Sequence, residues 1–231
     1  EGDDHPKTSQ PAPGEFVRVF EDLGKDADGI VSIHVSGKLS RTLNAAEQAK
    51  SLADTECPIE VIDSYHASMG LGLITMAAAK VAEEGGNMEN VVRTVKDTAG
   101  RAECFPLLDT LEYLQRGGRI GKARAMLGAL LKLKPIVTIR DGEVQPMGRA
   151  RTFTKGITLL EDAVRKLAPI EELCIIYSTT PDTAQEVADN LRDLLREGKE
   201  PIIARFGPSL GTHVGPGSVG VCLLRAKSET N

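Results

Sequence analysis

The sequence predicts an α/β protein built from two α/β domains, the first with a parallel sheet and the second with a mixed sheet. In the first half, short β-branched runs alternate with helical patterns, which is typical of parallel strands joined by crossover helices. In the second half, an Asp141-Gly142 turn between two strand-like runs indicates an antiparallel hairpin. We expect domains of residues 1–103 and 104–231, joined near Cys104-Phe105-Pro106.

The elements of the first domain follow in a regular order. The polar segment 8–16 leads into a helix, and Pro13 and Glu15 within it suit that helix's first turn. The β-branched runs 29–35 and 59–63 are the predicted strands. Apolar residues at helical spacing predict three further helices, at about 43–53, 70–84 and 88–101. The middle of the second is apolar nearly all round, so we expect it to be buried.

The second domain begins with the hairpin of strands 134–140 and 143–147. Helical and strand patterns then alternate to the end, at 154–167 (helix), 173–178 (strand), 182–197 (helix), 201–206 (strand) and 219–225 (strand). A glycine-rich run at 207–220, which we interpret as a turn, joins the last two strands.

Composition narrows the functional class. The 231 residues are 41% hydrophobic but only 3% aromatic, so aliphatic side chains must form the core. The net charge of −5 argues against a nucleic-acid partner. No apolar run reaches the roughly 20 residues that span a bilayer, and no signal peptide is evident, so we expect a cytoplasmic protein without membrane insertion. Four widely spaced cysteines without a CxxC pair indicate reduced thiols, not a zinc site or disulfides.

The glycine-rich run surrounds His213, one of only four histidines. Consecutive amides in such a turn can converge on an anion, and glycines let a ligand approach the backbone closely. The alternative is a tight turn into the last strand that His213 merely caps.

Three other segments carry hydroxyl groups into turns: 8–16, 35–42 and 63–72. The last two follow strands of the predicted parallel sheet, where α/β proteins bind ligands. Their hydroxyls and helix-start amides suit a carboxylate or phosphate. For the first segment, ordinary helix capping is an equal alternative.

Four arginines are weaker candidates for ligand binding. Arg116 and Arg119 flank Gly117-Gly118 and suit bidentate anion binding, but cations and glycines at a helix C-terminus are the preferred interpretation. Arg149 and Arg151 follow the hairpin, where exposed arginines are usually just solvated.

The sequence contains no phosphate-binding Walker motif, no GxGxxG, HExxH or GxSxG motif and no carboxylate cluster. The pattern therefore favours capture of an anionic head group by neutral donors, with aliphatic side chains around an apolar tail. Two alternatives stay open. One is a stand-alone hydrolase or phosphotransferase with His213 as general acid/base. The other is a structural or regulatory protein with a vestigial pocket.

Together these segments resemble the DegV family of bacterial fatty-acid-binding proteins. The similar motifs occur in family order: Thr8–Pro13 (TSQPSP), Ser36–Thr42 (SSKLSGT), Asp63–Gly72 (D[ST]…S.G.G), Leu111–Ile120 (L.YL.RGGRI), Lys134–Ile136 (KPI) and Gly211–Gly217 (G.H.GPG). Family members normally open with a further strand, so we expect the first domain to be incomplete at its N-terminus.

The resemblance implies an EDD-type fold that buries a long-chain fatty acid between its two domains. Such a subunit has no cofactor and no catalysis of its own. It presents the acyl carboxylate to a separate fatty acid kinase with a Dak-type domain, which makes acyl phosphate for phospholipid synthesis. Carried over by motif, the carboxylate-binding residues are Thr8, Ser36, Gly37, Ser40, Ser68 and His213. The kinase-facing residues are Arg149, Arg151 and His213.

Overall fold

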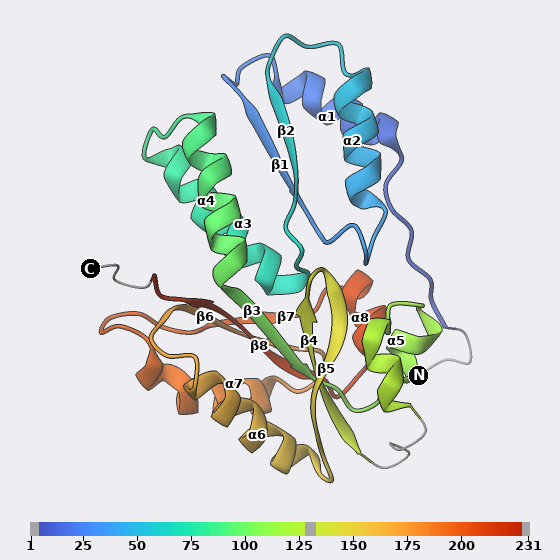
Figure 1. The fold of residues 1–231 in the computed structure, drawn as a ribbon, viewed down its shortest axis with the longest axis vertical. Coiled ribbons are helices and arrows are strands. Elements are labelled where there is room, and N and C mark those ends of the chain that lie inside the picture. The colour runs from blue at the N-terminus through green and yellow to red at the C-terminus, as the bar shows by residue number, and fades with distance from the viewer. Residues whose placement is uncertain (1–4, 128–132, 228–231) are drawn as a thin grey trace.

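The computed structural model describes residues 5–127 and 133–227. It contains a two-stranded parallel sheet and a six-stranded mixed sheet with strand order β5-β4-β3-β8-β6-β7, which confirms the predicted α/β class. Figure 1 shows the two sheets in separate layered units, one above the other.

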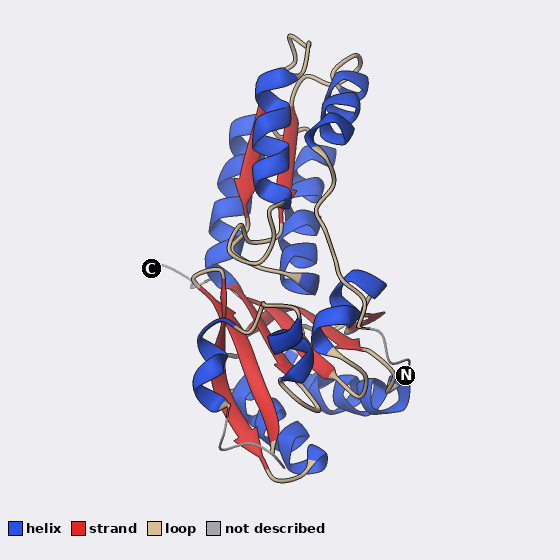
Figure 2. Cartoon of the chain, turned by 90° about the vertical axis from the view of Figure 1, so that its right-hand side faces the viewer, coloured by secondary structure: helices blue, strands red, loops and turns tan. Residues whose placement is uncertain are grey.

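The small sheet is covered on both faces by helices (Figures 1 and 2). Its strands β1, Ile30–His34, and β2, Ile59–Asp63, pair in parallel register. Helices α1, Pro13–Leu23, and α2, Thr42–Leu52, pack Phe20, Ala46 and Ala49 onto one face. Helices α3, Ser68–Glu83, and α4, Met88–Arg101, cover the other. These bounds agree closely with the sequence predictions.

The large sheet holds the strands β3 (Ala102–Leu107), β4 (Lys134–Arg140), β5 (Glu143–Ala150), β6 (Ile170–Tyr177), β7 (Ile202–Arg205) and β8 (Val219–Arg225). Only β6 and β7 pair in parallel; the other neighbours are antiparallel. One face packs under α6, Phe153–Arg165, and α7, Pro181–Leu191. The opposite face meets α3, which also contacts β1, so α3 joins the two units.

Two short helices complete the described chain beside β4. They are α5, Glu112–Arg116, and α8, Pro208–Val214, which contact each other. The 3₁₀ segments η1, Gly121–Met126, and η2, Arg192–Leu194, follow α5 and α7. Within the described residues, no helix has both the length and the apolar composition needed to cross a membrane.

The structure corrects two sequence predictions and adds one strand. The run 207–220 is not only a turn: Pro208 supplies the favourable N1 residue of α8, and Gly215 ends that helix with φ of +74°. The helix expected over 182–197 ends at Leu191 and continues as η2. Strand β3 was not predicted, because Pro106 cannot donate a ladder hydrogen bond. The domain boundary at 103/104 stays a prediction; β3 spans it.

Candidate functional site

A cavity of about 600 Å³ lies between the small unit and the large sheet. This volume is within the range of about 300–1,000 Å³ that is usual for small-molecule sites. The sheet contributes a mostly apolar floor, formed by Cys104, Pro106, Val137, Ile139 and Ile176. Gly220 lies between Pro106 and Ile176 in the sheet, where there is little room for a side chain, because a Cβ there would lie 3.1 Å from the Pro106 Cα and 3.3 Å from Ile176.

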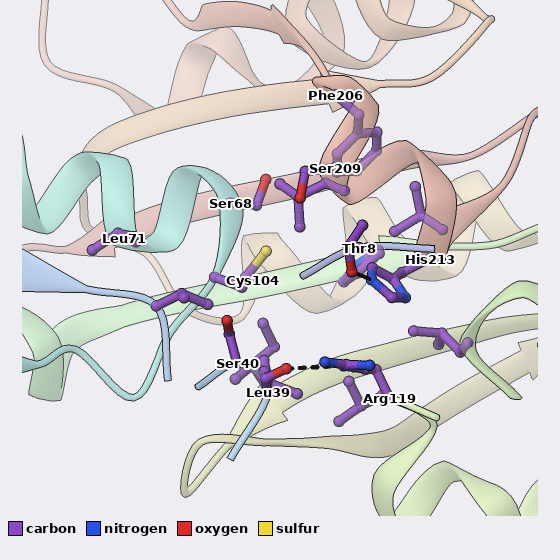
Figure 3. Close-up of a pocket in the computed structure, with 18 of the residues that line it drawn as sticks. Thr8, Leu39, Ser40, Ser68, Leu71, Cys104, Arg119, Phe206, Ser209 and His213 are labelled. Carbon is purple, nitrogen blue, oxygen red and sulfur yellow. Dashed lines mark hydrogen bonds between the residues drawn. The ribbon is translucent and has the colours of Figure 1, made fainter. Parts of the chain in front are cut away.

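Three of the predicted hydroxyl residues enter the cavity from separate parts of the chain. Thr8 comes from the extended segment before α1, Ser40 from the turn after β1, and Ser68 from the start of α3. Figure 3 shows Thr8 and His213 together on one side of the cavity and Leu71 on the other. Four of the six predicted carboxylate-binding residues therefore line one cavity: Thr8, Ser40, Ser68 and His213.

Asp63 holds together the two turns that follow β1 and β2. Its carboxylate accepts hydrogen bonds from the Gly37 amide at 3.1 Å and the Tyr65 amide at 2.8 Å. The Ser36 amide also donates to the His66 carbonyl at 2.9 Å. These bonds fix the path along which Ser40 reaches the cavity.

Ser36 and Gly37 do not line this cavity, which corrects their expected placement. Ser36 is fully buried, and its hydroxyl donates to the Gly142 carbonyl at 2.8 Å. Gly142 has φ of +76°, and a Cβ there would overlap the Ser36 hydroxyl. The Ser36 hydroxyl thus holds the hairpin tip against the small unit, and the Gly37 amide is used by Asp63.

His213 is held between the N-terminal segment and the Gly117-Gly118 turn. Its Nε2 is 2.9 Å from the Thr8 hydroxyl. Its Nδ1 is buried and has no hydrogen-bond partner within the described residues. Burial lowers the pKa of His213, and the nearby charges of Arg119 and His5 lower it further, so the neutral imidazole is favoured at pH 7.

Glycines allow α5 and α8 to pack closely enough to place this ring. A Cβ on Gly117 would lie 2.7 Å from His213 Cε1, and a Cβ on Gly215 would lie 2.8 Å from Cγ of Tyr113 and closer still to other atoms of that ring. Both distances are too short for van der Waals contact, so the motifs around Arg119 and His213 are packed against each other.

Arg119 also lines the cavity, although the sequence favoured a helix-end role. Its Nε donates to the Leu39 carbonyl at 3.0 Å (Figure 3), and its Nη1 donates to the Gly117 carbonyl at 2.7 Å. Arg116 instead pairs with exposed Glu112 on the same helix, as a helix-end arginine should. The two arginines differ in sequence position. Arg116 is the last residue of α5, whereas Arg119 follows the Gly117-Gly118 turn and lies beyond the helix end.

Other cavity residues went unnoticed in the sequence. Thr42 and Ser209 have ordinary helix-start patterns, and the Ser40 and Thr42 hydroxyls lie 2.8 Å apart.

Arg149 and Arg151 are exposed and do not line the cavity. They lie at the end of the hairpin opposite to its Gly142 tip.

The environment of His213 favours binding over catalysis. Its Nδ1 has no hydrogen-bond partner among the described residues, whereas the Nδ1 of a catalytic histidine is usually oriented by a carboxylate or a similar group. Among the described residues, no three His, Cys, Asp or Glu side chains form a cluster that could hold a metal ion.

The chain matches a family model described as an uncharacterised protein of the DegV family over residues 1–226. It is 36% identical over 218 residues to a DegV domain-containing protein of Streptomyces coelicolor, covering 93% of this chain and 76% of that protein. A structure described as fatty acid binding by a Thermus thermophilus DegV family protein has a TM-score of 0.88 at 33% identity, covering 96% of this chain and 79% of that one. Bacillus subtilis DegV, a fatty acid binding protein, has a TM-score of 0.83 at 30% identity, with the same coverage.

Proposed function

This chain belongs to the DegV family, and we propose that it binds a long-chain fatty acid in the cavity and presents the carboxylate to a separate kinase. The observation that carries the proposal is one cavity in which an apolar floor meets the hydroxyls of Thr8, Ser40 and Ser68. The family relatives from Thermus and Bacillus that are described as fatty-acid-binding support it.

The acyl tail supplies most of the affinity in this proposal. Each methylene removed from water contributes about 0.8 kcal/mol, so a sixteen-carbon chain needs no strong clamp on its head group. The aliphatic lining from β3, β4 and α8 receives the tail.

The head group binds between Thr8, Ser40, Ser68 and His213, with Arg119 as the nearby cation. Neutral hydroxyl donors orient a carboxylate yet leave charge on its oxygens. A carboxylate oxygen held in this way can attack the terminal phosphorus of a nucleotide on the kinase. Arg119 already donates two hydrogen bonds to main-chain carbonyls, which restrains it from clamping the carboxylate bidentately.

The kinase in this proposal is a Dak-type protein in the cytoplasm, and the acyl phosphate enters phospholipid synthesis. The binding protein itself performs no reaction with the nucleotide. Exposed Arg149 and Arg151, with His213, form the proposed kinase-facing set.

Fatty-acid binding is tested by native mass spectrometry of the purified chain and by calorimetric titration with palmitic acid after delipidation. Thr8→Val combined with Ser40→Ala removes two donors to a charged group. Each donor is worth about 1.5–3 kcal/mol, so the double variant should bind palmitate at least about 100-fold more weakly. Ser51→Ala is the control, since its exposed hydroxyl bonds only to its own helix.

Unchanged palmitate binding and unchanged kinase-dependent acyl-phosphate formation in the double variant would refute this site. Protein that stays empty in repeated preparations would favour a vestigial pocket. Turnover of acyl or phosphoryl esters without any kinase would favour the stand-alone enzyme with His213 as acid/base.

A further inference from the structure

Two turns supply hydroxyl groups to the head-group end of the cavity. The first turn, residues 36–40, follows β1, and the second turn, residues 63–68, begins at the end of β2. Ser40 and Ser68 are the last residues of these turns, and both line the cavity. Figure 3 shows Cys104 between them. The direction of each hydroxyl therefore depends on how its turn is held.

One carboxylate, that of Asp63, joins the two turns. Its Oδ2 accepts a hydrogen bond from the Gly37 amide at 3.1 Å, and its Oδ1 accepts one from the Tyr65 amide at 2.8 Å. Asp63 does not line the fatty-acid cavity; it lines a separate cleft of about 560 Å³. It therefore acts on a ligand in the cavity only through its neighbours in the two turns.

The second turn is strained where it leads to Ser68. Tyr65 and Ser68 both have φ of +56°, in the left-handed region that residues other than glycine adopt only at a cost. Such conformations persist where surrounding bonds hold them. The Tyr65 amide is held by Asp63, and the next amide, that of His66, donates to the Ser64 hydroxyl at 3.1 Å. Loss of the Asp63 bond lets the turn relax and turns Ser68 away.

The hydroxyl of Ser40 is arranged as a donor. Its oxygen accepts a hydrogen bond from the Thr42 amide at 3.2 Å and lies 2.8 Å from the Thr42 hydroxyl. When the Thr42 hydroxyl donates to this oxygen, the proton of Ser40 is free for a ligand. A hydrogen bond from such a donor to a charged acceptor is roughly twice as strong as one to a neutral acceptor.

We propose that Asp63 is a positioning residue that makes the cavity select free fatty acids over uncharged lipids of the same length, such as fatty alcohols. By holding both turns, it aims the Ser40 and Ser68 hydroxyls at the carboxylate. This inference rests on the proposed function, because the carboxylate must lie between these hydroxyls. The selection matters for that function, since only a free carboxylate yields an acyl phosphate.

The charge of Asp63 and its hydrogen bonds have opposite effects on an anionic ligand. Removal of a nearby negative charge favours an anion, whereas release of the two turns disfavours it. Asparagine has almost the same shape but only one acceptor oxygen. In Asp63→Asn, one of the Gly37 and Tyr65 amides therefore loses its partner. The direction of the change in affinity separates positioning from charge.

The test compares palmitic acid with 1-hexadecanol on the delipidated full chain, by displacement of bound parinaric acid. The parent should prefer palmitic acid. Asp63→Asn should bind palmitic acid about 10-fold more weakly, the equivalent of one hydrogen bond to a charged group, and should bind hexadecanol as the parent does. Asp141→Asn is the matched control: it removes the same charge from an exposed residue of the same cleft, and asparagine tolerates its φ of +53°.

A double-mutant cycle shows whether Asp63 acts through the hydroxyls. In a background of Ser40→Ala with Ser68→Ala, Asp63→Asn should have no further effect on palmitic acid affinity. Urea unfolding establishes that each variant is folded. If Asp63→Asn does not fold, Gly37→Ala decides, because it keeps the charge of Asp63 but places a Cβ 3.3 Å from its Oδ2 and 2.9 Å from the Leu43 side chain. Gly37→Ala should weaken palmitic acid binding and leave hexadecanol binding unchanged.

Three results would overturn the proposal while fatty-acid binding stands. One is unchanged or tighter palmitic acid binding by Asp63→Asn. Another is an equal loss for palmitic acid and hexadecanol, which is the signature of a merely structural role. The third is an undiminished effect in the background that lacks both hydroxyls. The same criteria apply to Gly37→Ala. If the parent chain binds neither lipid, the proposed function fails and this inference fails with it.

Discussion

Replacing Gly117 with alanine should weaken fatty-acid binding without any change to a residue that carries a polar side chain. The new Cβ would lie 2.7 Å from Cε1 of His213 and closer still to its Nδ1. It would also lie 3.2 Å from the Tyr113 carbonyl, which belongs to the helix backbone and cannot move easily. The imidazole must therefore move, and this movement breaks the present 2.9 Å hydrogen bond between His213 Nε2 and the Thr8 hydroxyl.

Two contributions set the size of this effect. Overpacking of a close contact costs about 1–3 kcal/mol of folding stability. Loss of the Thr8–His213 hydrogen bond adds about 0.5–1.5 kcal/mol, much of which falls on ligand binding because both residues line the cavity. We expect palmitate affinity to fall by about 10-fold, which corresponds to about 1.4 kcal/mol.

Palmitate titration by calorimetry measures the affinity, and urea unfolding measures the stability. Gly118→Ala is the matched control: its φ of +70° strains the new side chain, but no atom lies within 4 Å of the added Cβ. Gly118→Ala should therefore lose stability and retain affinity.

A double-mutant cycle with His213→Ala isolates the clash. The stability lost through Gly117→Ala should largely disappear once the ring is removed, because the space it filled is then open to the new methyl group. Equal palmitate affinity in Gly117→Ala, Gly118→Ala and the parent chain would refute the reasoning. So would a stability loss that persists undiminished in the His213→Ala background.

Three further predictions concern the hairpin tip, the surface arginines and pH. Gly142→Ala should lower the free energy of unfolding by about 1–3 kcal/mol, because position 142 has a positive φ and the added Cβ overlaps the Ser36 hydroxyl. The loss should be smaller in a Ser36→Ala background. Equal losses in urea unfolding of both backgrounds would show that the overlap is unimportant. Charge reversal of exposed Arg149 and Arg151 should leave palmitate affinity unchanged and reduce kinase-dependent acyl-phosphate formation several-fold. Arg18→Glu, at another exposed arginine, is the control. Equal kinase rates in these variants would remove Arg149 and Arg151 from the kinase-facing set. Burial lowers the folded-state pKa of three histidines: His34, His66 and His213. As the pH falls below about 6.5, the unfolded chain therefore binds more protons than the folded chain, and the free energy of unfolding should decrease. Equal stability in calorimetry at pH 7.5 and pH 5.5 would contradict this.

Local pattern was sufficient for most of the fold. The apolar spacing of 88–101 predicted α4 to the residue, and the Asp141-Gly142 turn predicted the antiparallel hairpin. Strand β3 was not predicted because it contains Pro106, which cannot donate a ladder hydrogen bond, yet this residue has a place in the ladder opposite Gly220 on β8. That place depends on a strand more than one hundred residues away, which no local window contains.

The candidate site divides in the same way. Thr8, Ser40, Ser68 and His213 stand in turns whose hydroxyls, glycines and positions after strands mark them as ligand-binding candidates. Ser36 stands in the same turn as Ser40 and has the same chemistry, yet its hydroxyl is used by the Gly142 carbonyl. Sequence could not separate the two serines, because the distinction is made by a hairpin that arrives from the other unit.

The sequence by itself determined the α/β class, the order of most elements and the set of polar turns, because these follow from periodicity and backbone preference within about fifteen residues. Only the tertiary structure decided which polar groups face the cavity. In the folded chain Ser36 and Gly37 lie outside the cavity lining, Arg119 belongs to it, and Cys104 is paired with Cys222 across β3 and β8. Strand register and the packing of α3, α5 and α8 are sums over distant contacts, so their outcome is not written in any single segment.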